Sequence, residues 1–128
     1  MATWDDVRRI ALSLPETVER EGAHPQWRVG DKLVVWDRPL RRSDVAALGA
    51  DAPEGPVLGA RVSDEGVKHA LVAEEPGVYF TTPHFDGWPA VLVRLEAISG
   101  ADLAELMTEA WLCQAPKRLA EQFLAERG

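Results

Sequence analysis

The residues best suited to chemistry stand close together in the second half of the chain. Residues 81–94 carry His84, Phe85, Asp86 and Trp88. An apolar, strand-like segment leads into this stretch and another leads out, so we interpret it as a hairpin with a long loop. Aromatic and imidazole rings on such a loop can stack on a flat ligand or on a nucleic-acid base. The aspartate is followed by glycine, which also suits an ordinary turn, so the alternative is that Phe85 and Trp88 fold back as packing residues.

A second candidate site lies at the start of the last expected helix, where Lys117 and Arg118 follow a proline. Two cations in the first turn oppose the helix dipole, which favours acidic residues there by about 0.3–1 kcal/mol each. The free N–H groups of a helix N-terminus attract anions, and nearby cations strengthen that attraction. A phosphate or carboxylate is therefore one candidate ligand, with Arg41, Arg42 and Arg94 as candidate neighbours. The alternative is that Lys117 and Arg118 form only surface ion pairs.

The other reactive side chains lack the spacing that catalysis or metal binding requires. The histidines and carboxylates match no metal-binding motif, and the sequence contains no nucleophile elbow, phosphate-binding glycine loop or dinucleotide fingerprint. The helical position of Cys113 puts it near an apolar face, where a cysteine is usually an inert small side chain. Glu105 and Glu109 share a helix face that is most simply solvated. We therefore expect no enzyme activity, no metal and no cofactor.

The composition suits one domain over residues 1–128. Hydrophobic residues make up 46% of the 128-residue chain and charged residues 27%, which is ordinary for a protein with a single core. The net charge of −7 opposes non-specific binding to nucleic acid, which depends on Lys and Arg meeting phosphates. The chain shows no signal peptide, and no apolar run approaches the roughly 20 residues that span a bilayer. We expect a cytoplasmic protein without membrane contact; its oligomeric state stays open.

Hydrophobic periodicity and turn residues indicate an α+β fold. Helical spacing follows Thr3 and again Ser99, each with an aspartate three residues later, as in a capping box. Gly30 and Asp31 between two strand-like runs indicate a tight hairpin. The expected order is a helix, three strands, a mixed central region, the hairpin around residues 81–94 and two final helices. Neighbouring strands joined by tight turns predict a mainly antiparallel sheet, covered on one face by the N- and C-terminal helices.

Three parts of the chain carry a family resemblance: residues 12–16, residues 79–94, and residues 106–118 at the end of the penultimate helix and the start of the last. In these motifs the chain resembles the MmcQ/YjbR-like family of small bacterial proteins. The resemblance implies a fold like that of CyaY, the bacterial frataxin homologue, with a sheet backed by two main helices. It also implies DNA binding, a label that rests on fold analogy, and it supplies no catalytic residues. Iron binding is not implied, because the first helix carries Arg8 and Arg9 beside its acidic residues.

Three hypotheses for function follow from these observations. The first is a non-enzymatic nucleic-acid-binding protein, in which Arg41, Arg42, Lys117 and Arg118 gather on one face near the stacking rings of the loop. The second is a protein that binds a small anion or another small molecule in a pocket between residues 83–89 and the last helix. The third is a protein–protein adaptor that uses exposed tryptophans.

Overall fold

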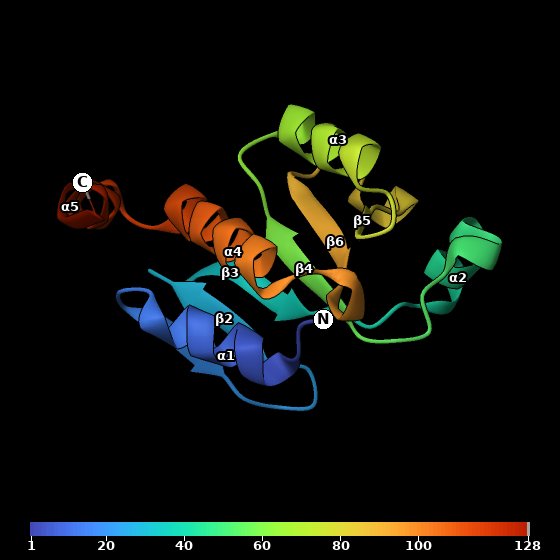
Figure 1. Cartoon of the computed structure of the whole chain (residues 1–128), viewed down its shortest axis with the longest axis horizontal. Helices are drawn as coiled ribbons and strands as arrows, with labels where there is room; N and C mark the ends of the chain where they lie inside the picture. The colour runs from blue at the N-terminus through green and yellow to red at the C-terminus, as the bar shows by residue number, and fades with distance from the viewer. Residues whose placement is uncertain (128) are drawn as a thin grey trace.

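The computed structural model describes residues 1–127, and a six-stranded sheet lies at its centre (Figure 1). The strands are β1 (Thr17–Arg20), β2 (Gln26–Val29), β3 (Lys32–Asp37), β4 (Val57–Arg61), β5 (Tyr79–Phe80) and β6 (Ala90–Arg94). Their order across the sheet is β1-β2-β3-β4-β6-β5, and every neighbouring pair is antiparallel. The predicted α+β class and antiparallel sheet are confirmed.

The helices are α1 (Trp4–Ser13), α2 (Arg42–Leu48), α3 (Glu65–Glu74), α4 (Gly100–Gln114) and α5 (Lys117–Arg127). Three short 3-10 helices are η1 (Gly49–Asp51), η2 (Pro83–Phe85) and η3 (Leu95–Ala97). The predicted caps are present: the Thr3 hydroxyl accepts a hydrogen bond from the Asp6 amide at 3.3 Å, and the Ser99 hydroxyl accepts one from the Asp102 amide at 3.1 Å. The predicted tight turn is also present, with φ of 54° at Gly30 and 65° at Asp31.

Helices α1 and α4 cover one face of the sheet, as the sequence predicted. Trp27 and Leu58 on this face and Trp111 of α4 are completely buried in the main core. Each buried indole N–H finds an acceptor: that of Trp27 donates to Glu19 at 2.8 Å, and that of Trp111 donates to the Pro15 carbonyl at 3.1 Å. The opposite face has a smaller core of its own. Its buried members are Trp36, Val57, Phe80, Phe85, Ala90 and Leu92.

The last helix lies beyond the sheet. Figure 1 shows α5 at one end of the long axis of the molecule and α2 at the other end. Leu119 is buried and Phe123 packs on Trp111 with ring centroids 4.8 Å apart, so α5 extends the main core at its margin. Of the two C-terminal helices, α4 packs across β3 and β4.

Candidate functional site

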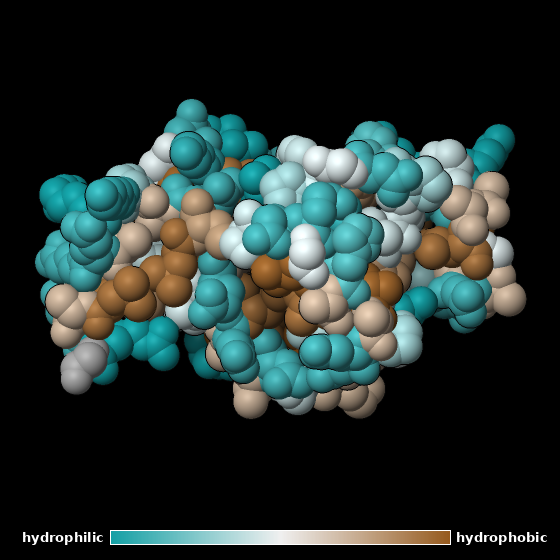
Figure 2. All heavy atoms as spheres, turned by 90° about the horizontal axis from the view of Figure 1, so that it is seen from above, coloured by the Kyte–Doolittle hydropathy of each residue, from teal (hydrophilic) through white to brown (hydrophobic). Residues whose placement is uncertain are grey.

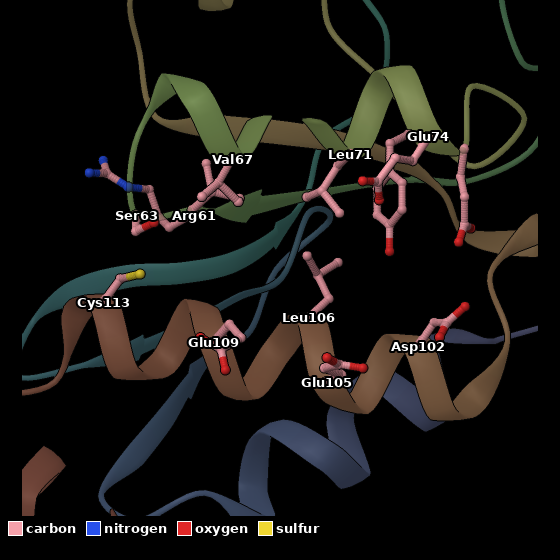
Figure 3. A pocket seen from close by; sticks show the side chains of 13 residues that line it. Arg61, Ser63, Val67, Leu71, Glu74, Asp102, Glu105, Leu106, Glu109 and Cys113 are labelled. Carbon is pink, nitrogen blue, oxygen red and sulfur yellow. The ribbon is translucent and has the colours of Figure 1, made fainter. Parts of the chain in front are cut away.

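A groove with a volume of about 340 Å³ runs between α3 and α4 (Figure 3). This volume lies within the range of small-molecule sites. Its floor is apolar and is formed by Val62, Val67, Leu71 and Leu106. Five carboxylates line its walls: Glu74, Glu75, Asp102, Glu105 and Glu109. Seen from the α3 side, Figure 2 shows an apolar area at the centre of this face, bordered by polar residues.

Helix α4 supplies one wall of the groove. Asp102, Glu105 and Glu109 are spaced three and four residues apart, which places them on one side of the helix. The opposite side of α4 packs into the core through Leu103, Met107 and other apolar residues. The sequence indicated this acidic face, and its interpretation as a plain solvated face was incomplete, because α3 stands opposite it across the groove.

Helix α3 supplies the other wall. It begins after Asp64, whose carboxylate accepts a hydrogen bond from the Val67 amide at 2.9 Å. Its C-terminal end carries Glu74 and Glu75, with no basic residue in the last turn. Carboxylates at this end oppose the helix dipole at a cost of about 0.3–1 kcal/mol each. Together with the acids of α4, these two residues concentrate negative charge at this end of the groove.

Tyr79 lies at the same end of the groove. The residue is only 5% exposed, but its hydroxyl reaches the solvent of the groove and makes no hydrogen bond with any residue within 1–127. Burial raises the pKa of Tyr79 to about 12, and the negative charges of Glu75, Asp102 and Glu105 add to this effect. The phenol therefore stays neutral at physiological pH and offers an unused oxygen among three carboxylates, an arrangement suited to an ammonium group.

The other end of the groove carries Arg61, Ser63 and Cys113 (Figure 3). The prediction that Cys113 packs on an apolar face is wrong, because the residue is exposed and lines the groove. The walls nevertheless partly enclose its sulfur, and this burial, together with the charge of Glu109, raises the pKa of the thiol. The thiol is therefore protonated near neutral pH and is a weak nucleophile.

The predicted loop lies on the other face of the sheet, outside the groove. Phe85 is buried, with 2% exposed, and stacks on the 41% exposed Trp88 with ring centroids 5.6 Å apart. His84 and Asp86 are exposed on the surface. Lys68 of α3 donates hydrogen bonds to the carbonyls of Phe85 at 2.7 Å and Trp88 at 2.8 Å. The loop therefore contributes one packing ring and one half-exposed ring.

The four basic candidates do not converge. Lys117 and Arg118 begin α5, whereas Arg41 and Arg42 lie at the start of α2, at the opposite end of the molecule (Figure 1). The prediction of a pocket between the loop and the last helix is also wrong. Helix η2, which belongs to the loop, packs against α2, at the opposite end of the molecule from α5. Among the residues described, neither Lys117 nor Arg118 forms an ion pair. Arg94 instead donates to the carbonyls of Pro76 and Asp51.

The groove acids are spread along a channel instead of meeting at one point. Within residues 1–127, no group of three or more His, Cys, Asp and Glu side chains is arranged to hold a metal ion. The described helices also include none with the length and hydrophobicity needed to cross a bilayer.

The tryptophans offer little surface to a partner protein. Of the five in the chain, Trp27 and Trp111 are fully buried, Trp36 is 7% exposed and Trp4 is partly buried. Trp88 is the one large exposed ring among residues 1–127. The adaptor hypothesis required several exposed tryptophans, and the structure does not provide them.

Comparisons of sequence and of structure identify proteins that are similar to this chain. The YjbR family model matches residues 12–113. The chain is 63% identical over 131 residues to "Uncharacterized protein Rv2570" of Mycobacterium tuberculosis and to "Uncharacterized protein Mb2600" of Mycobacterium bovis, with both chains fully covered. A crystal structure of Deinococcus radiodurans protein DR2400, a DUF419 domain, superposes with a TM-score of 0.64 at 20% identity, covering 88% of this chain and 78% of that one. The similarity to DR2400 concerns the fold alone.

Proposed function

The chain belongs to the YjbR family, and from that membership and the groove we propose that it is a non-enzymatic binding protein for organic cations. The observation that carries this proposal is the unpartnered hydroxyl of Tyr79 among three groove carboxylates. An ammonium group there donates hydrogen bonds to the carboxylates and to the phenol oxygen. The hydrocarbon part of the ligand rests on Leu71 and Leu106 in the floor.

A non-enzymatic role accords with the chemistry of the groove. Its one thiol has a raised pKa, and no histidine lines the groove to act as a general base. The five carboxylates have an electrostatic role in this proposal: they attract the cation and fix its position. The single cysteine suits a reducing compartment, and we include a cytoplasmic location in the proposal.

Titration calorimetry with n-hexylamine and n-hexanol at low salt tests this proposal. We expect the amine to bind at least about tenfold more tightly than the alcohol, since the alcohol brings no charge. The double variant Asp102→Asn/Glu105→Gln removes two charges worth about 1 kcal/mol each, so amine affinity should fall roughly thirtyfold. Glu121→Gln, on the exposed surface of α5, makes the same kind of change outside the groove and serves as control. Equal affinity for amine and alcohol, or an unaffected double variant, would contradict the proposal.

Nucleic acid is the second candidate ligand that we propose, because an aromatic ring and a cation share one surface. The Arg61 guanidinium lies over the half-exposed Trp88 ring, 5.3 Å from its centroid. Stacking on such a ring contributes about 1–3 kcal/mol per base. Titration with a short single-stranded DNA at two salt concentrations should then show binding that weakens steeply with salt and is lost in Trp88→Ala. Absence of binding at low salt removes this candidate.

A further inference from the structure

The carboxylates of α4 form a ladder with two unequal steps. Asp102 and Glu105 are three residues apart, and Glu105 and Glu109 are four residues apart. At 1.5 Å of rise per residue, the steps are about 4.5 Å and 6 Å along the helix axis. All three side chains line the groove, so negative charge repeats along its length with this spacing.

A linear aliphatic triamine has a matching pattern of positive charge. By ordinary bond lengths, nitrogens joined by an extended three-carbon linker are about 5 Å apart, and those joined by a four-carbon linker about 6 Å. We propose that the groove binds a linear aliphatic triamine with one three-carbon and one four-carbon linker, an inference that rests on the proposed function. The groove thereby determines the ligand's length, its number of charges and its orientation.

The ends of the groove determine this orientation. The amine of the three-carbon arm lies at Asp102, where the free hydroxyl of the 5% exposed Tyr79 adds an acceptor. The central amine lies at Glu105 and the amine of the four-carbon arm at Glu109. Beyond Glu109 the groove ends near Arg61, whose positive charge disfavours further cations (Figure 3).

The floor accounts for the linkers. Leu106 lies on α4 between Glu105 and Glu109, and Leu71 and Val67 face it from α3 (Figure 3). Methylene groups between the ammonium groups therefore rest on apolar side chains, while the charged nitrogens reach the carboxylate wall. A hydrated metal ion would gain nothing from this floor, since it has no apolar surface to bury.

Titration calorimetry at near-neutral pH and low salt, with spermidine, 1,3-diaminopropane and n-propylamine as probes, tests the inference. We expect affinity to rise about tenfold with each added ammonium group and to fall as salt is added. Glu109→Gln should weaken spermidine about tenfold and 1,3-diaminopropane by less than about threefold, because the diamine contacts only the Asp102 and Glu105 positions and feels the charge of Glu109 at longer range. Glu109 is exposed, so the substitution leaves the fold intact, and Glu121→Gln is the matched control.

The outcomes separate the two proposals. Spermidine that binds no more tightly than 1,3-diaminopropane overturns the triamine inference and leaves the organic-cation proposal standing. A Glu109→Gln variant that binds spermidine normally has the same consequence. If none of the three amines binds at low salt, both proposals are wrong.

Discussion

Replacing Lys68 with methionine is expected to lower the free energy of unfolding by about 3–5 kcal/mol, the range for breaking a buried charged network. Lys68 is 1% exposed. Its ammonium group donates to the carbonyls of Phe85 and Trp88 at 2.7 and 2.8 Å and forms an ion pair with Glu65 at 3.0 Å. Methionine fills similar space but offers no donor, so it leaves these acceptors unpaired. Urea denaturation followed by circular dichroism measures the loss.

Lys32→Met is the matched control for this substitution. Lys32 is exposed at the start of β3 and forms no ion pair within residues 1–127, so its replacement should change stability by less than about 0.5 kcal/mol. Equal denaturation midpoints for the two variants would show that the ammonium of Lys68 does not hold the loop. Because Lys68 belongs to α3, its loss should also loosen one wall of the groove.

Local sequence patterns predicted the elements that depend on neighbouring residues. The caps at Thr3 and Ser99 and the turn at Gly30 and Asp31 each arise from side chains or backbone angles within a few positions, and the structure has all of them. The acidic face of α4 was visible for the same reason, since three- and four-residue spacing aligns side chains on a helix.

The candidate site depends on contacts that no local pattern encodes. Tyr79 reaches the carboxylates of α4 only because β5 lies beside β6 at the sheet edge, with α3 packed over both. Lys68 looks in sequence like an ordinary surface lysine three residues from Glu65, yet it is buried under the loop. The basic residues expected to form one surface lie at opposite ends of the molecule, because Lys117 begins a helix beyond the sheet. One local signal was missed: the acids that end α3 oppose the helix dipole as clearly as the cations that begin α5.

Replacing Gly59 with alanine is expected to destabilise the protein by about 3 kcal/mol, the upper end of the range for overpacking a core. A Cβ atom at Gly59 would overlap the indole of Trp36, which lies directly across the β3–β4 pair. Trp36 is 7% exposed and lies among the buried residues of the second core, so its indole can leave only by disrupting that core. Thermal or urea unfolding measures the loss.

A double-mutant cycle separates this clash from other effects of the added methyl group. In a Trp36→Leu background the indole is gone, so Gly59→Ala should cost less than about 1 kcal/mol, and the cycle should give a coupling energy of about 2 kcal/mol. Gly100→Ala is the matched control, since a Cβ atom there meets nothing within 4 Å and lies in the first turn of α4. An equal cost of Gly59→Ala in both backgrounds would mean that the indole does not require the glycine. If Gly59→Ala lowers stability only where Trp36 is present, the second core requires glycine at position 59. The surface that carries Trp88 then depends on the same glycine.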